Sequence, residues 1–140
     1  MLPPSIPLGV TLMDDDHARI EDALAQAARV ADAGLHAALQ RCRAELAGHF
    51  AREEALMEAA GLPVLGCHVA QHRRLIDDVD AMLKDAAATP ERLRLYIARD
   101  LPNLVLAHIA SIDQLSARFL TGEIPGATMA RLRMAEEAAS

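Results

Sequence analysis

Apolar residues recur along this chain at alternating steps of three and four, the spacing of one face of an α-helix. Glycine and proline interrupt the pattern at Gly34, around Gly61 and Pro63, and at Pro90. The pattern therefore predicts four amphipathic helices joined by short connections, over residues 14–33, 35–60, 65–87 and 90–120.

Short connections place sequential helices side by side, so we expect an all-α fold, an antiparallel up-down-up-down four-helix bundle. The richness in alanine and leucine argues against an all-β or a doubly wound α/β fold. The bundle is expected over residues 13–120, with an extended N-terminal arm over residues 1–12 and a C-terminal tail or short helix over residues 121–140. Pro102 predicts a kink in the fourth helix, one turn before His108.

Composition limits the partners and the cellular location that the protein can have. The 140 residues are the size of one domain, and a net charge of -6 without a basic run argues against nucleic acid and anionic membrane surfaces as partners. No apolar run is long enough to span a membrane. The first residues lack the basic start of a signal peptide, and two cysteines are too few for a disulfide scaffold. We therefore expect a cytoplasmic protein.

Polar residues interrupt the apolar stripes at positions that should face the core. A single buried histidine is usually a hydrogen-bonded structural residue, but here five of the six histidines and one glutamate lie on the stripes, with no lysine or arginine beside them. Buried imidazoles and carboxylates need partners, and a metal site satisfies all of them at once. The candidate ligands are His17, His49, Glu53, His68, His72 and His108, with Asp113 near the last stripe.

The spacing of the candidates supports shared metal ions. His49 and Glu53 are four residues apart, as are His68 and His72, so each pair points to one side of its helix. The three residues Asp14, Asp15 and Asp16, just before the first of the candidate histidines, are expected to cap the first helix.

The last candidate pair has a different spacing. His108 and Asp113 are five residues apart, which on an α-helix separates them by about 140° around the axis. Asp113 is therefore expected on the flank of the stripe, where it can bridge two ions rather than chelate the same ion as His108.

The number and type of ligands exclude simpler metal sites. Five histidines and two carboxylates are too many for one tetrahedral zinc or for a haem. Calcium and magnesium would not select imidazoles, and the Glu-x-x-His motif of ferritin-like proteins is absent from the sequence. What remains is a site for two metal ions of borderline hardness with mixed nitrogen and oxygen ligands, and iron is the natural choice.

These residues, in this order, resemble the hemerythrin family, in particular the bacterial hemerythrin-like domains (bacteriohemerythrins). The family pattern is one histidine, then His-x-x-x-Glu, then His-x-x-x-His, then His-x-x-x-x-Asp. The resemblance covers about residues 8–120, and the matching segments are Asp14-Asp-Asp-His17, His49-Phe-Ala-Arg-Glu53, His68-Val-Ala-Gln-His72 and His108-Ile-Ala-Ser-Ile-Asp113.

The resemblance implies a di-iron protein that binds O2 reversibly, for oxygen storage, transport, delivery or sensing, and that is not an enzyme. It implies that Glu53 and Asp113 bridge the two irons together with an oxo or hydroxo group. One iron would be held by three histidines and the other, which keeps an open position for O2, by two. The two sets would be His68, His72 and His108, and His17 and His49.

The surroundings of the O2 site depart from the family pattern. Leu104 stands where the family usually has a tryptophan, and Val105 takes the place of the apolar residue over the O2 site. By the resemblance, both would line the O2 pocket. Two other functions stay open at this point, a redox enzyme that reduces peroxide, O2 or nitric oxide on the same site, and a regulatory metal-binding protein. The chain could be a monomer or a small homo-oligomer, with a protein partner for its tail.

Overall fold

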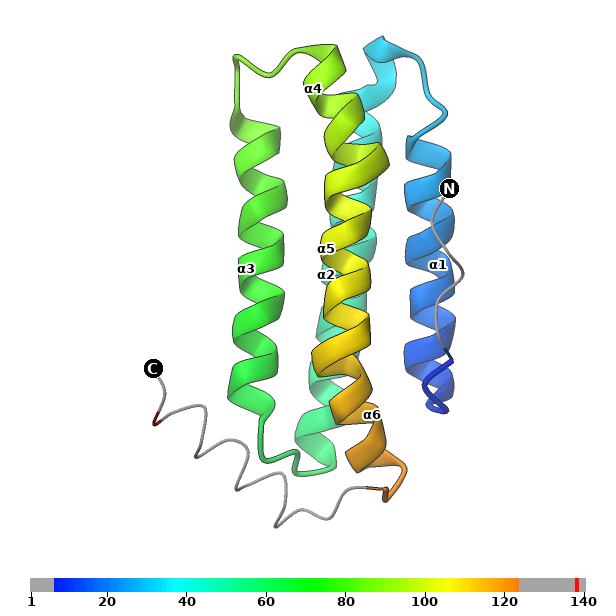
Figure 1. Cartoon of the computed structure of the whole chain (residues 1–140), viewed down its shortest axis with the longest axis vertical. Coiled ribbons are helices and arrows are strands. Elements are labelled where there is room, and N and C mark those ends of the chain that lie inside the picture. Colours follow the sequence, from blue (N-terminus) through cyan, green and yellow to red (C-terminus); the bar gives the residue numbers. More distant parts are fainter. Residues whose placement is uncertain (1–6, 124–137, 139–140) are drawn as a thin grey trace.

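The computed structural model describes residues 7–123 and residue 138, and it confirms the all-α fold as an antiparallel four-helix bundle (Figure 1). The first three rods are single helices, and the fourth is a continuous run of five helical segments. The first three are α1 (Thr11–Ala27), α2 (Leu35–Ala59) and α3 (Leu65–Lys84). The fourth comprises α4 (Pro90–Leu95), a π-helical segment (Tyr96–Asp100), α5 (Leu101–His108), a second π-helical segment (Ile109–Asp113) and α6 (Gln114–Leu120).

The first helix differs from its predicted bounds at both ends. It begins at Thr11, inside the predicted arm, and the backbone N–H groups of Leu8 and Gly9 donate to the Asp14 carboxylate. It ends at Ala27 rather than near residue 33 because Arg94 of the fourth rod donates to the carbonyls of Ala28 and Val30 and fixes a non-helical connection. A 3₁₀ turn at Asp32–Gly34 then leads into α2.

The ends of α2 and α3 are set by local turns. Gly61 has a φ of +69°, the left-handed conformation that often ends a helix, and Leu62 N–H donates back to the carbonyl of Met57. The third helix ends at Lys84, three residues early, where Ala87 N–H donates to the Asp85 carboxylate. Most of the predicted tail, residues 124–137 and 139–140, lies outside the described residues.

The apolar core is divided along the bundle axis into two clusters. Along α2, Leu46 belongs to a large cluster shared by all four rods, and Met57 to a smaller one with Leu62 and Val64. His49 and Glu53 lie between them on the same buried face of α2. No helix among residues 7–123 has the length and apolar character needed to cross a lipid bilayer.

The kink predicted at Pro102 takes the form of a π-helical turn immediately before it. Proline lacks an N–H and its ring clashes with the carbonyl four residues earlier. Here the N–H of Leu101 donates to the carbonyl of Tyr96, five residues before it, so the helix is wider where the proline ring enters.

The second π-helical turn corrects the expected position of Asp113. Gln114 N–H donates to the carbonyl of Ile109, five residues earlier, and the Ser111 hydroxyl donates to the carbonyl of Ala107 at 2.7 Å. That hydroxyl competes with the backbone for a helical acceptor, which favours a local widening. In such a turn residues five apart lie on one side, so Asp113 points to the same side as the preceding histidine and not to the flank.

Candidate metal centre

The structure gathers all seven predicted ligand side chains in the middle of the bundle. All seven are buried, and their nitrogen and oxygen atoms form two groups in which every atom lies within 4.8 Å of the others. The helices supply them in the order α1, α2, α3 and the fourth rod. The residues are His17, His49, Glu53, His68, His72, His108 and Asp113.

The first group contains three histidines. The Nε2 atom of His68 lies 2.6 Å from Glu53 Oε1 and 2.7 Å from Asp113 Oδ1. His72 Nε2 lies 3.3 Å from the same Glu53 oxygen, and His108 Nε2 lies 2.8 Å from the same Asp113 oxygen. Three imidazole nitrogens and one oxygen from each carboxylate therefore face one point.

The second group uses the other oxygen of each carboxylate. His17 Nε2 lies 2.9 Å from Asp113 Oδ2, and His49 Nε2 lies 2.9 Å from Glu53 Oε2. Glu53 and Asp113 each turn one oxygen to the three-histidine group and the other to the two-histidine group. This is the arrangement that two carboxylates bridging two ions require.

The contacts inside the cluster fit metal ions better than hydrogen bonds. Both oxygens of Glu53, and the Nε2 atoms of His49, His72 and His108, are buried and make no well-aligned hydrogen bond with any described residue. Leaving several buried polar atoms unpaired is costly, and native proteins rarely do so. A pair of cations would satisfy every one of these atoms, so the residues present fit the group that the sequence predicts.

Both carboxylates are held in the charged form. Burial alone would raise the pKa of Glu53, but contacts with the imidazoles of His49 and His68 lower it to about 2. Burial would likewise raise the pKa of Asp113, and His108 and His17 hold it far below the usual range. Burial lowers the pKa of His68, but the two carboxylates outweigh this and raise it to about 9. A proton on His68 takes the place of a cation, so metal binding at that imidazole has to displace the proton.

A buried aspartate supports His49 from behind. The carboxylate of Asp16 accepts from His49 Nδ1 at 3.1 Å and from two guanidinium groups, those of Arg52 at 2.9 and 3.0 Å and Arg19 at 2.7 Å. Burial would raise the pKa of Asp16, but Arg52 and His49 lower it to about 2. Of the three aspartates expected to cap α1, Asp16 instead fixes a candidate ligand. Its place next to His17 was the available signal in the sequence.

Three other ligand histidines are held in the same manner. His72 Nδ1 donates to the Glu54 carboxylate at 2.9 Å, and His68 Nδ1 is 2.8 Å from the Ser116 hydroxyl. His108 Nδ1 donates to Gln71 Oε1 at 3.3 Å. In each case the partner fixes the ring and leaves Nε2 for the cluster.

All three partners escaped the sequence analysis, and Gln71, a polar residue between two candidate ligands, gave no signal of its own. Glu54 is charged and lies just outside the inward stripe, and Ser116 is small and uninformative on its own. For His17, in contrast, the buried Nδ1 has no hydrogen-bond partner in the part of the chain that the structure describes.

A phenylalanine next to His49 is a further residue that the sequence analysis missed. The ring of Phe50 stacks on His72, with centroids 3.9 Å apart and planes 8° apart, and it also contacts His49 and His108 edge-on or tilted. One apolar ring thus restricts the orientation of three candidate ligands. The sequence shows that Phe50 is an aromatic residue next to a candidate ligand. It does not show that its ring stacks on His72, which lies on another helix.

The two residues expected at the O2 pocket lie in different places. Val105 is buried and lines a tight apolar space beside the two-histidine group. Leu104 is 42 % exposed and lines a surface cavity between α3 and α5, so its expected role in the O2 pocket is corrected. The reason is helical geometry, because adjacent residues differ by about 100° around an α-helix, and here Val105 faces the core while Leu104 turns toward solvent.

Comparison with known proteins gives a consistent result. The family model described as the hemerythrin HHE cation binding domain matches residues 8–120. A curated bacteriohemerythrin from Ralstonia nicotianae is 29 % identical over 120 residues, which cover 86 % of this chain and 88 % of that protein. No solved structure matches the chain significantly.

We expect Asp16→Ala to weaken metal binding by on the order of 10- to 100-fold, because His49 loses the carboxylate that fixes its ring. The measurement is competition with a chromophoric chelator. Asp15→Ala is the matched control, since Asp15 is the exposed neighbour on the same helix. Equal affinities for both variants would contradict a supporting role for Asp16.

We expect Glu53→Ala to lose more metal per chain than His17→Ala, because Glu53 faces both groups and His17 only one. Metal content of the purified variants decides this, with Glu45→Ala, an exposed site on the same helix, as control. A larger loss from His17→Ala would count against Glu53 as a bridge.

Proposed function

The chain belongs to the hemerythrin family, and from this premise we propose that it binds two iron ions and uses them to bind O2 reversibly, without acting as an enzyme. Family membership and the buried histidine–carboxylate cluster make it a metal-binding protein. The identity of the ions, their bridging and the reversible binding of O2 are the proposal.

The division of carboxylate oxygens between the two groups supports the assignment of ligands. His68, His72 and His108 would hold one iron and His17 and His49 the other, with one oxygen of each carboxylate assigned to each ion. The second ion has one histidine fewer, so it is the one with a position for an external ligand. When bound, the iron pair supplies the electrons that O2 binding needs and recovers them on release.

The observation that carries the proposal is the apolar enclosure beside the two-histidine group. Among the residues that the structure describes, only apolar side chains line this space apart from candidate ligands, and it is too tight for a water molecule. They are Ile20, Leu46, Phe50, Leu75, Val105 and Ile109.

This enclosure explains what the chain contributes to reversible binding. Its lining offers no proton donor besides the ligand imidazoles, and it keeps bulk water from the open position. Small shifts of the Val105 and Ile109 side chains would admit a diatomic molecule, whereas a larger substrate would require repacking of the core. A tight apolar lining suits a carrier better than an enzyme, which would need a proton donor for reduction.

The proposal extends to the surroundings of the protein. We propose that it works in the cytoplasm, because two cysteines are too few for the disulfide scaffold of a small secreted protein. The Cys42 thiol supports this, because it is buried and lies 3.6 Å from the carbonyl of Ala23, as expected of a reduced core residue.

The test is the absorption spectrum of the anaerobic ferrous protein, recorded before O2, after O2 and after sparging with argon. We expect a new absorption band on oxygenation that disappears on sparging and returns on a second addition. A protein that forms no such species, but consumes peroxide or nitric oxide many times per site, would be an enzyme and not a carrier.

We expect Val105→Asn to speed the decay of the oxygenated form in air several-fold, because the amide admits water and a hydrogen bond to the enclosed space. Leu104→Asn, the same type of change one residue earlier on the exposed side, should leave the decay unchanged. Val105→Thr adds a hydroxyl at nearly constant volume and serves if the asparagine variant unfolds. Equal decay in all the proteins would contradict the role of the enclosure.

A further inference from the structure

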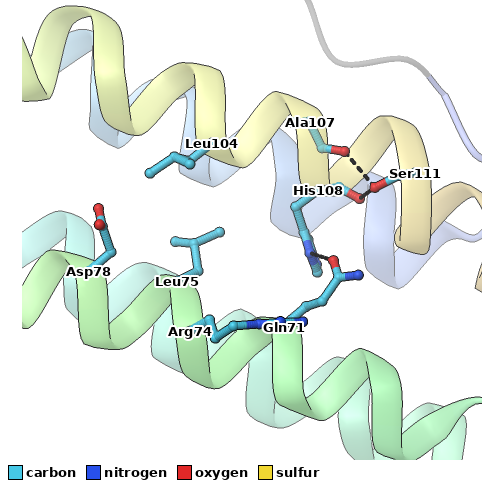
Figure 2. Close-up of a pocket in the computed structure, with 8 residues that line it drawn as sticks. All are labelled: Gln71, Arg74, Leu75, Asp78, Leu104, Ala107, His108 and Ser111. Carbon is cyan, nitrogen blue, oxygen red and sulfur yellow. Dashed lines mark hydrogen bonds between the residues drawn. The ribbon is translucent and has the colours of Figure 1, made fainter. Parts of the chain in front are cut away.

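A cavity of about 350 Å³ opens between α3 and α5 on the surface of the bundle (Figure 2). This volume lies within the range of small-molecule binding sites. Each helix contributes one stripe of residues to it, Gln71, Arg74, Leu75 and Asp78 from α3, and Leu104, Ala107, His108 and Ser111 from the fourth rod. The inner end of the cavity reaches His108, a candidate metal ligand.

The cavity exists because the fourth rod does not fill its seam with α3. Ala107 and Ser111 are small, and the Ser111 hydroxyl turns back to the carbonyl of Ala107. Leu104 is a large apolar residue at this seam, but it does not fill the gap, and its side chain is 42 % exposed. Leu75 projects from the opposite side, so Leu75 and Leu104 form two apolar walls (Figure 2).

Two side chains with hydrogen-bond donors lie at the end of the cavity beside His108. The side chain of Arg74 extends toward Gln71 (Figure 2), and its guanidinium makes no ion pair or hydrogen bond with residues 7–123. Gln71 Oε1 accepts from His108 Nδ1 at 3.3 Å, which leaves the amide NH₂ of Gln71 as a donor. A charged guanidinium beside a free amide NH₂ is a pair of donors suited to a carboxylate.

The other end of the cavity carries an acidic side chain instead of a basic one. Asp78 lies there, and its carboxylate accepts a hydrogen bond from the Tyr96 hydroxyl at 2.6 Å. Asp78 is an exposed acidic side chain, and it disfavours a second anionic group on the same ligand. The cavity is therefore positive at one end, apolar in the middle and negative at the other end.

We propose that this cavity binds a small amphipathic monocarboxylate, with its carboxylate on Arg74 and Gln71 and its apolar body between Leu75 and Leu104. An aromatic and an aliphatic acid share this chemistry, and the experiment distinguishes them. Binding does not depend on the proposed O2 function, because none of the four residues that would contact the acid is a candidate metal ligand.

A consequence for the metal centre does rest on the proposed function. A carboxylate on the NH₂ of Gln71 polarises the amide and strengthens the bond that its oxygen accepts from His108. The ligand and the metal are then coupled through one side chain, and coupling is reciprocal. The acid should bind the metal-loaded protein and the chelator-stripped protein with different affinities.

The chain contains no tryptophan, so the fluorescence anisotropy of added indole-3-acetate reports its binding without background from protein indole. We expect binding to the protein as isolated at concentrations below about 1 mM, a free energy of about 4 kcal/mol. Octanoate competing for the same site would identify an aliphatic preference, and failure to compete an aromatic one. Indole-3-ethanol, which lacks the charge, and octanedioate, which adds one near Asp78, should each bind at least about tenfold more weakly than the matching acid.

Variants locate the site. Arg74→Gln should weaken indole-3-acetate binding by about tenfold or more. Ala107→Phe should abolish binding by filling the cavity without changing charge. Arg73→Gln is the matched control, since Arg73 is the exposed neighbour that lines a different cavity between α2 and α3, and it should change affinity by less than about twofold.

Several results would overturn the proposal. These are equal binding of indole-3-ethanol and indole-3-acetate, equal effects of Arg74→Gln and Arg73→Gln, or no binding of either acid at 1 mM, the limit set above. Equal affinities for the metal-loaded and stripped protein would overturn the coupling through Gln71. A protein that binds these acids at this cavity but fails to bind O2 would refute the carrier proposal and support this one.

Discussion

Two fully buried carboxylates at the centre of the bundle set the main constraint on this structure. Glu53 and Asp113 are 0 % exposed, and a buried ionised carboxylate without a partner costs several kcal/mol. Among the described residues no lysine or arginine forms an ion pair with them, and imidazoles from all four rods converge there instead. The apolar core accordingly divides into two clusters, one on each side of the polar centre. The bundle is thus arranged around a site for cations rather than around a continuous apolar core.

The imidazoles depend on a second set of residues, which contact the Nδ1 atoms on the sides of the rings away from the centre. Asp16, Glu54 and Gln71 accept from the Nδ1 atoms of their histidines, and Ser116 contacts a fourth. Donation from Nδ1 fixes the tautomer in which Nε2 carries a lone pair, and Nε2 is the nitrogen that faces the centre. These contacts prepare the ligands before any ion arrives, which reduces the ordering that metal binding would otherwise require.

The fourth rod shows how a departure from α-helical geometry can serve the site. On a regular α-helix, Asp113 would lie about 140° from His108 and could not meet it. The π-helical turn between them brings His108 Nε2 to 2.8 Å from Asp113 Oδ1, and the other oxygen of Asp113 reaches His17 on α1. The same rod leaves a loosely filled seam against α3, and Gln71 connects that seam to the centre.

The amino-acid sequence by itself determined the fold class and the set of seven candidate ligands. Helical periodicity decides which residues face inward, and a polar residue on an apolar stripe is visible without coordinates. The sequence could not show that Asp16 supports His49, that Phe50 stacks on His72, or that Leu104 faces solvent. Those facts depend on the rotation of each helix and on contacts across the bundle, which local spacing does not encode. The end of α1 was likewise decided by a tertiary contact, because Arg94 on a distant helix binds the connection that follows it. The direction of Asp113 was decided by a π-helical turn, whose hydrogen bonds form only in the folded rod.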